Sequence, residues 1–258
     1  MTIGIARAEQ FSPNSVAKDR AILEAVVNRF NGVIVSEADL DKTISAQHTF
    51  LNMGRLPETI EWLKQREGEG ARVLNSAYGV EKCRRDRFDA LMKEHHIAIP
   101  PVNKDGACWV KRADGAAQSE DDVVFCKNDA ALSEAKERFE TNGIDYIVQP
   151  HVNGDWVKFY GVEGAGFFRT FYPGDDCGWK FGHEAVNGKP HHYFYEKEHL
   201  RATLEMLSRL ARTPIYGGDA VVTPDGEFYV IDFNDWPSFS RCRDEAAEAI
   251  CKVIGYGL

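Results

Sequence analysis

The pattern of apolar residues changes at about Pro100 and Pro101, and this change limits what the chain can fold into. Before it, short apolar runs alternate with apolar residues at helical spacing, which predicts strands at residues 3–6, 32–35, 49–53 and 72–75. After it, strand-like runs come in pairs, and helices are predicted at about 129–141, 197–212 and 243–254. Alternating strands and helices favour a small parallel sheet, whereas paired strands favour antiparallel sheets. We therefore expect an α/β domain followed by an α+β domain.

Composition excludes several classes of protein. The 258 residues carry a net charge of −9, which argues against general binding to nucleic acid or anionic membranes, because such binding needs a basic surface. No apolar run is long enough to span a bilayer, and the N-terminus has no signal-peptide pattern. The six cysteines form no CxxC pair and no zinc-ligand spacing. These features predict a cytoplasmic protein without nucleic-acid or membrane partners.

The segment from Asp219 to Asn234 contains the most informative pattern. Two apolar runs flank a Pro-Asp-Gly turn signal, which predicts a hairpin. If Pro224–Glu227 form its loop, the register places Asp219 opposite Asp232. Asn234 follows two residues later and therefore lies on the same face of the strand. The hairpin thus brings three oxygen-bearing side chains together at one end.

These three side chains form a candidate metal site. Two carboxylates at that separation repel each other unless a cation lies between them. Oxygen ligands suit Mg²⁺, with Mn²⁺ as an alternative, and bound Mg²⁺ commonly shares its other positions with water and phosphate. The competing interpretation is that Asp219 and Asp232 are solvated residues at strand ends. The apolar residues Val230, Ile231 and Phe233 predict a buried strand, which favours the metal site.

The hairpin resembles a known signature. Asp219, then Asp232-Phe233-Asn234, then Trp236-Pro237 resembles the C-terminal motif of ATP-grasp enzymes, in which an Asp, a second acid and an Asn bind magnesium. With Ser238 and Phe239, the motif is most similar to ribosomal-protein glutamate ligases and inositol-trisphosphate kinases. The resemblance implies an α/β pre-ATP-grasp domain and an ATP-grasp domain whose two α+β lobes sandwich ATP. The expected boundaries are 1–102 for the first domain, 103–258 for the second, and about 103–152 and 153–258 for its lobes.

Upstream segments are similar to further motifs of the same family and occur in the expected order. They are Val73–Ser76, Arg85–Arg87, Ile99–Pro101 and Trp109–Arg112. The resemblance assigns Arg87 and Lys111 to the two positions that usually hold a phosphate-binding Lys. The competing interpretation of Arg87 is a solvated helix face. Residues 113–117 correspond to a loop that folds over the phosphates in the family, or alternatively form an exposed turn.

The segment from 147 to 155 resembles the hinge that binds adenine in this family. Gln149 stands where Glu or Gln is usual, and the peptide groups of Pro150, His151 and Val152 would meet the base. Pro150 lacks an N–H, so the donors must come from its neighbours. Asp155 is the candidate for contact with the ribose hydroxyls.

A second hairpin is predicted around a loop at Glu163–Gly166. This register places Tyr160 opposite Arg169, and Lys158 lies on the same face. Two cations on one face are unfavourable unless an anion lies across them, as a triphosphate or a developing oxyanion would. We therefore assign Lys158 and Arg169 to catalytic charge neutralisation, and Lys158 also to the nucleotide. The alternative is a cationic outer face.

The implied function is transfer of the γ-phosphate of ATP to an acceptor. We expect a magnesium-dependent ligase that activates a carboxylate as an acylphosphate for attack by an amine or similar nucleophile. A kinase of the same fold acting on a small-molecule hydroxyl and a non-catalytic nucleotide-binding protein are the alternatives. The acceptor, a small molecule or peptide, is expected to contact Arg55, Ser238, Ser240 and Arg241. The oligomeric state does not follow from the sequence.

Overall fold

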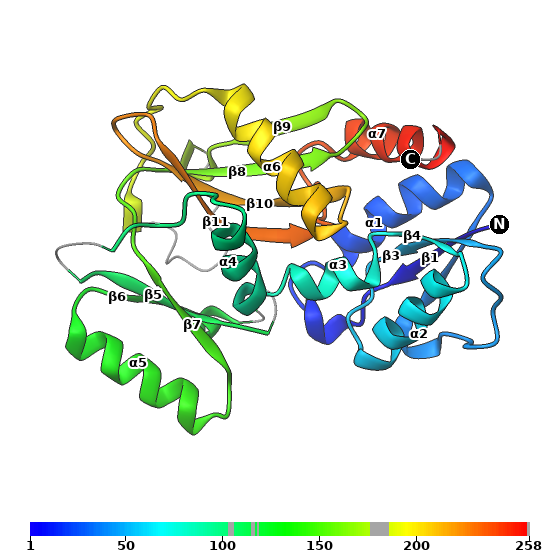
Figure 1. Ribbon diagram of the computed structural model, residues 1–258, viewed down its shortest axis with the longest axis horizontal. Coiled ribbons are helices and arrows are strands. Elements are labelled where there is room, and N and C mark those ends of the chain that lie inside the picture. The colour runs from blue at the N-terminus through cyan, green and yellow to red at the C-terminus, as the bar shows by residue number, and fades with distance from the viewer. Residues whose placement is uncertain (103–105, 115–116, 118, 176–185, 257–258) are drawn as a thin grey trace.

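The chain folds into three β-sheets with helices packed against them (Figure 1). The computed structural model describes residues 1–102, 106–114, 117, 119–175 and 186–256. The sheets follow one another along the chain, so the first is N-terminal and the third contains the hairpin with Asp219 and Asp232. Short 3₁₀ helices lie in the connections at Glu9–Phe11, Asn28–Phe30, Glu37–Asp39, Glu120–Asp122 and Pro173–Asp175.

The first sheet is parallel, as the alternating pattern predicts. Its strands, in the order β2-β1-β3-β4, are β1 (Thr2–Ala6), β2 (Val33–Ser36), β3 (Thr49–Asn52) and β4 (Arg72–Leu74). The helices of this part are α1 (Val16–Val27), α2 (Pro57–Gly68), α3 (Ala77–Lys82) and α4 (Arg85–Glu94). Pro57 opens α2 at the first helical turn, where a missing N–H costs no hydrogen bond. Since the strands are parallel, the loops after β1 and β3 leave the same edge of the sheet.

The second sheet is small and antiparallel. Its strands, in the order β6-β5-β7, are β5 (Cys108–Arg112), β6 (Val123–Cys126) and β7 (Tyr146–Pro150). Helix α5 (Asp129–Thr141) packs on it through Ala135 and Phe139, which join Val110 in one buried cluster. Asn128 caps this helix by accepting a hydrogen bond from the backbone N–H of Ala131 at 3.0 Å.

The third sheet is also antiparallel and contains both predicted hairpins. Its strands, in the order β11-β10-β8-β9, are β8 (Asp155–Val162), β9 (Phe167–Phe171), β10 (Ile215–Val222) and β11 (Phe228–Asp235). Helix α6 (Lys197–Ala211) buries three leucines against one face of this sheet, where they join Phe159 and Phe233. The period of these leucines, at 200, 204 and 207, is that of one helix face.

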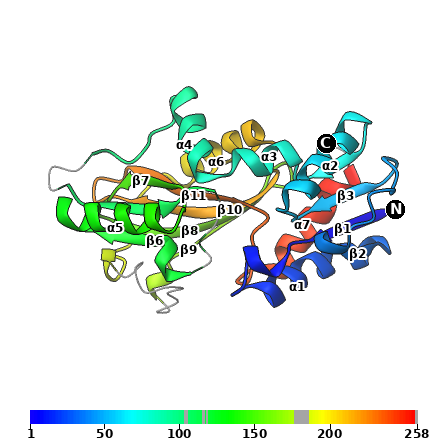
Figure 2. The same cartoon turned by 90° about the horizontal axis from the view of Figure 1, so that it is seen from below.

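The C-terminal helix α7 (Arg243–Tyr256) returns to the first sheet. It packs beside α1 (Figure 2). Ile22 and Ile250 belong to the same buried cluster as Tyr160 of β8 and Trp236, which follows β11. The end of the chain therefore links the first and third sheets. The domain boundaries at 102 and 152 stay predictions. No helix in the described part of the chain is both long and apolar enough to cross a membrane.

Candidate functional site

A cavity of about 600 Å³ is lined by residues from all three sheets. The first sheet contributes the loops after β1 and β3, the second contributes β5 and β7, and the third contributes β8, β10 and β11. The positively charged lining residues that the structure describes are Arg7, Lys18, Arg55, Arg85, Lys111, Lys158 and Arg241. The negatively charged ones are Asp19, Asp219, Asp232 and Asp235. The cavity thus carries an excess of positive charge in a chain whose net charge is −9.

One row of charged residues crosses the third sheet at this cavity. Asp219 on β10 pairs with Asp232 on β11, so the predicted register of the two aspartates is confirmed. On its other side, Asp219 pairs with Lys158 of β8. Asn234 lies two pairs further along β11, opposite Gly217, and also lines the cavity.

The loop and the strand pairing that lead to this pair of aspartates differ from those predicted. The loop is one residue longer than Pro224–Glu227, because Val222 pairs with Phe228. A bulge between Asp219 and Ala220 then restores the expected alignment, and Ile231 is the additional residue on β11. The carbonyl of Ile231 accepts a hydrogen bond from Lys111 at 3.1 Å, so the bulge also connects β11 to the second sheet.

The two aspartates are each bound by cations of the chain itself. Oδ1 of Asp219 accepts hydrogen bonds from Nζ of Lys158 at 2.8 Å and from Nε1 of Trp156 at 2.9 Å. Oδ2 of Asp232 accepts one from Arg85 at 2.9 Å. Burial alone would raise the pKa of Asp232, but Arg85 and Lys111 outweigh it and lower that pKa below its ordinary value. Asp232 is therefore held as a carboxylate at neutral pH.

The donor set fits a hard divalent cation. No described residue donates a hydrogen bond to Oδ2 of Asp219 or Oδ1 of Asp232, so each carboxylate keeps one oxygen for a ligand. Among the described residues, no group of three or more His, Cys, Asp or Glu side chains is placed to hold a metal ion. Asn234 is the third oxygen-bearing side chain of the hairpin at this cavity, and its role as a metal ligand stays a prediction.

Lys111 faces this row from the second sheet. Its ammonium is buried and donates to Oε1 of Gln149 at 2.7 Å as well as to Ile231. Burial, followed by the nearby Arg85, lowers the pKa of Lys111 to about 8. Both Lys111 and Gln149 line the cavity. An anion in the cavity would stabilise the charged form of this lysine.

The predicted hinge also lines the cavity, through Pro150, His151 and Val152. Nδ1 of His151 accepts a hydrogen bond from Nε1 of Trp109 at 3.1 Å, and Trp can only donate. The proton of the neutral imidazole is therefore on Nε2, which lies 3.1 Å from Oδ1 of Asn153. Burial lowers the pKa of His151, which favours this neutral form.

Asp155 does not line the cavity, contrary to its predicted contact with ribose. Its buried carboxylate accepts hydrogen bonds from the backbone N–H groups of His191 at 2.7 Å and Tyr193 at 2.8 Å. It therefore fixes the segment that precedes α6. This segment lies 36 and 38 residues beyond Asp155, and no local pattern announces the contact.

Arg87 also lies outside the cavity lining. Its side chain is 53% exposed, and its guanidinium lies 3.7 Å from Glu81. The structure therefore does not bring Arg87 to the metal hairpin, and the interpretation as a solvated helix face describes it better.

Arg85, two residues before Arg87, lines the cavity instead, and sequence reasoning did not assign it. It is buried at the start of α4, where it pairs with Asp232 and donates to the carbonyl of Arg112 at 3.1 Å. A signal for it exists in the sequence. Arg85, Phe88 and Met92 have the spacing of one helix face, and all three are buried, whereas Arg87 faces away from them.

The predicted phosphate loop at 113–117 lies partly outside the described residues, at 115 and 116. Its described residue Asp114 is exposed and pairs with Arg112 at 2.6 Å. A role in covering phosphates stays a prediction.

Arg169 has the predicted register but not the predicted surroundings. It pairs with Tyr160 across β8 and β9, as expected. However, its side chain is 45% exposed and forms an ion pair with Glu245 of α7, and it does not line the cavity. Its guanidinium lies over the ring of Phe167 at 5.1 Å. The structure thus separates Arg169 from Lys158, whose ammonium is in the cavity.

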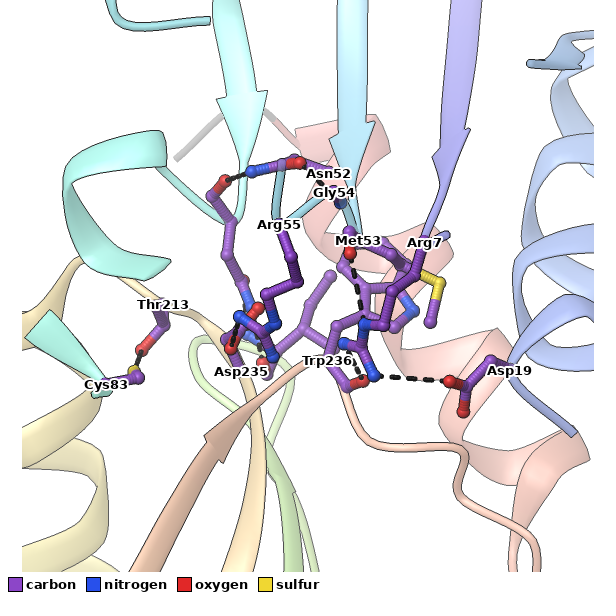
Figure 3. A network of polar contacts seen from close by, with 12 residues as sticks. Arg7, Asp19, Asn52, Met53, Gly54, Arg55, Cys83, Thr213, Asp235 and Trp236 are labelled. Atoms are coloured by element: carbon purple, nitrogen blue, oxygen red, sulfur yellow. Dashed lines mark hydrogen bonds and ion pairs between the residues drawn. The ribbon is translucent and has the colours of Figure 1, made fainter. Parts of the chain in front are cut away.

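The four predicted acceptor residues, Arg55, Ser238, Ser240 and Arg241, all line the cavity, at the end that the first sheet closes. Arg55, which follows β3, forms an ion pair with the buried Asp235 of β11 (Figure 3). Their contact with an acceptor stays a prediction.

Two further lining residues, Arg7 and Asp19, escaped the sequence reasoning. Arg7 follows β1 directly, and its guanidinium lies 3.2 Å from the carboxylate of Asp19 on α1. Neither belongs to a recognisable motif. Their place at the cavity depends on contacts between segments far apart in the sequence.

Comparison with known proteins places this geometry in a wider context. Neither a protein-family model nor a curated protein sequence matches the chain. D-alanyl-alanine synthetase A from Vibrio cholerae is similar with a TM-score of 0.67 and 11% identity, covering 99% of this chain and 97% of that chain. A RimK domain ATP-grasp protein from Sphaerobacter thermophilus has a TM-score of 0.64 and 16% identity, covering 99% of each chain. The ATP-grasp ligase PsnB, solved with a minimal precursor, Mg and ADP, has a TM-score of 0.60 and 11% identity, covering 98% of each chain.

These matches cover almost the full length of this chain and of each similar protein, so they include all three sheets and their order along the chain. Identities this low carry the fold and not the activity. The chain therefore has the ATP-grasp fold, as its sequence motifs predict.

Proposed function

We propose that the protein is a magnesium-dependent ligase that uses ATP to activate a carboxylate as an acylphosphate. The observation that carries this proposal is the row Lys158–Asp219–Asp232, which faces Lys111 across one cavity. Two of the similar solved proteins support it, since one is named as a D-alanyl-alanine synthetase and the other, PsnB, is named as a ligase and was solved with Mg and ADP.

The residues divide into roles along the cavity. The hinge at Pro150–Val152 would hold the base, and Lys111 and Arg85 would neutralise the phosphates. Asp219, Asp232 and Asn234 would hold Mg²⁺, which supplies charge neutralisation at the transferred phosphate. Arg85, rather than Arg87, is the cation assigned to this end of the phosphates.

The reaction needs no covalent bond to the protein. An oxygen of the acceptor carboxylate attacks the γ-phosphorus, and ADP leaves. The amine then attacks the carbonyl carbon of the acylphosphate, phosphate leaves, and an amide forms. The task of the chain is to orient the reactants and to neutralise charge, with Lys158 placed beside Asp219 at the reacting end.

The charge of the cavity favours this reaction over phosphorylation of an inositol polyphosphate. Among the described lining residues, seven cations face four carboxylates. This excess suits a magnesium nucleotide and one carboxylate acceptor. A polyphosphorylated ring would bring far more negative charge than the excess can neutralise.

The five described cysteines are free thiols, which supports a reducing compartment such as the cytoplasm.

Trapping with hydroxylamine tests the proposal without knowledge of the natural nucleophile. The protein is incubated with ATP, Mg²⁺, hydroxylamine and a panel of amino acids, dipeptides and dicarboxylates. An acylphosphate intermediate gives a hydroxamate and ADP with one panel member. A stable phosphoryl product without hydroxamate would indicate a kinase, and nucleotide binding without turnover on any acceptor would indicate a non-catalytic protein.

A further inference from the structure

The metal strand ends in an unusual backbone conformation. Trp236, two residues after Asn234, has a φ of 43° and is fully buried. Left-handed backbone is unfavourable for a bulky side chain, so it persists only where the surroundings hold it. The N–H of Trp236 donates to the carbonyl of Ile215 at 2.9 Å. The carbonyl of Trp236 accepts a hydrogen bond from Nη2 of Arg7 at 3.4 Å.

One guanidinium joins three elements at this point (Figure 3). Besides Trp236, Arg7 binds the carbonyl of Met53 through Nε at 3.2 Å, and Oδ2 of Asp19 through Nη1 at 3.2 Å. These partners lie at the end of β3 and on α1. The planar fork of Arg can direct donors to three partners at once, which a Lys ammonium at the end of a flexible chain cannot reproduce.

The loops that carry the arginines are themselves fixed by one buried carboxylate. Oε1 of Glu37 accepts a hydrogen bond from the N–H of Ala8 at 2.5 Å. Oε2 accepts from the N–H groups of Arg55 at 2.6 Å and Leu56 at 2.7 Å. The residue after Arg7 and the backbone of Arg55 are therefore held in place independently of any ligand.

The two arginines act on consecutive residues of the metal strand. Arg55 pairs with the side chain of Asp235, and Arg7 binds the carbonyl of Trp236. Both contacts lie immediately after Asn234, whose amide is the third ligand of the proposed metal site. A change in the turn at Trp236 would rotate the end of β11 and move Asn234 relative to Asp232.

We propose that Arg7 is a positioning residue for the metal site, which fixes the turn at Trp236 and thereby the orientation of Asn234. This inference rests on the proposed function, because it needs a metal at Asp219, Asp232 and Asn234. Through Arg7, the first sheet determines how well the third sheet binds Mg²⁺. In this proposal Arg7 acts through the carbonyl of Trp236 and not by contact with the metal.

The test uses the full chain and the non-hydrolysable analogue AMPPNP. Calorimetry measures AMPPNP affinity without Mg²⁺ and over a series of Mg²⁺ concentrations, for the parent and for Arg7→Lys. The Mg²⁺ concentration at half-saturation should rise by about tenfold in the variant, as it does when the hydrogen bonds that orient metal ligands are lost. Mg²⁺-free affinity for AMPPNP should stay within about twofold of the parent, because the hinge and Lys111 are unchanged.

Two further variants make the result decisive. Arg20→Lys is the matched control, because Arg20 lies on the exposed face of α1 and pairs only with Glu24 among the described residues. It should behave as the parent does. Asp19→Asn weakens the hold on Arg7 without touching Trp236, and should raise the Mg²⁺ requirement by a smaller factor in the same direction. If Arg7→Lys does not fold, as judged by circular dichroism, Asp19→Asn decides.

The outcomes separate this inference from the proposed function. If the parent shows no coupling between Mg²⁺ and AMPPNP, both fail. If the parent shows coupling but Arg7→Lys and Asp19→Asn need no more Mg²⁺ than the parent, only the inference about Arg7 fails. It also fails if affinity falls equally with and without Mg²⁺, since that result indicates a general structural role.

Discussion

Two hairpins of the third sheet carry pairs of charged side chains that were predicted to share one site, but only one hairpin presents both members of its pair to the cavity. In β10–β11, Asp219 and Asp232 face each other, and both line the cavity. In β8–β9, Lys158 lines the cavity, but Arg169 is turned away to Glu245 on α7. The predicted residue pair is formed in both hairpins, although a bulge interrupts the register of β10–β11. The two hairpins differ in the direction that the charged side chains take beyond Cβ.

Side-chain length explains this difference. The carboxylate of an Asp is one carbon from Cα, so register alone places its charge within a small volume. The guanidinium of an Arg is several rotatable bonds from Cα, and it settles where a partner is available. Glu245 offers Arg169 such a partner outside the cavity. Register therefore predicts the position of short charged groups better than that of long ones.

The largest effect is expected from breaking the first hairpin at Asp232. Asp232→Asn keeps the shape but removes the charge that binds a metal and pairs with Arg85. Hydroxamate formation should fall by more than about 100-fold, and Mg²⁺ should no longer tighten AMPPNP binding. Asp225→Asn, at the exposed turn of the same hairpin, is the control and should match the parent. A variant at Asp232 that still couples Mg²⁺ to the nucleotide would exclude this hairpin as the metal site.

The second largest effect should distinguish the two arginines of α4. Arg85→Ala removes a buried charge-assisted contact with Asp232 and a cation facing the phosphates, so ATP affinity should fall by about tenfold or more. Arg87→Ala, two residues away but 53% exposed, should change ATP affinity by less than about twofold. Isothermal titration at one Mg²⁺ concentration measures both. The reverse order would return the phosphate-binding role to Arg87.

A third effect concerns Lys111, which binds the bulge residue Ile231 of the first hairpin. The pKa of Lys111 in the free protein is about 8, and a bound triphosphate should raise it. Nucleotide binding then takes up a proton, so affinity is highest below pH 8 and falls as the pH rises through 8. The slope cannot exceed about tenfold per pH unit for one group.

The measurement is AMPPNP affinity between pH 7 and 9.5, together with the same series for Lys111→Met. The variant should bind more weakly at pH 7 and lose most of the pH dependence in this range. A parent profile that is flat from pH 7 to 9.5 would mean that Lys111 does not face the phosphates.

The residues that sequence reasoning found and missed follow the same distinction. The pairing of Asp219 with Asp232 follows from strand register, even though the loop is one residue longer than expected and a bulge compensates for it. Lys111 was assigned from the resemblance of Trp109–Arg112 to a family motif, and the structure places it at the cavity. Arg85 could have been identified from the sequence, because its spacing to Phe88 and Met92 marks the buried face of α4.

Other contacts could not be predicted, because they join distant segments. Arg7 binds Met53, 46 residues away, and Trp236, 229 residues away. Asp155 is enclosed by a segment that returns to it from beyond β9. Such contacts depend on how sheets pack on each other, and a single sequence without that packing holds no periodic signal for them. The order of sheets, by contrast, follows from local periods and turn chemistry.

The smallest effect is expected in the second hairpin and tests the comparison most directly. Arg169→Gln removes an ion pair that is half exposed, so stability should fall by less than about 1 kcal/mol. Hydroxamate formation should stay within about twofold of the parent. Lys158→Gln, two residue pairs away on the neighbouring strand, should reduce it by about tenfold or more because Lys158 binds Asp219. Steady-state kinetics and thermal unfolding of the two variants give both quantities. The contradicting outcome is that Arg169→Gln loses as much activity as Lys158→Gln at unchanged stability. Arg169 would then have to leave Glu245 and enter the cavity during the reaction. In that case the substrate, rather than the fold, would determine where long side chains lie.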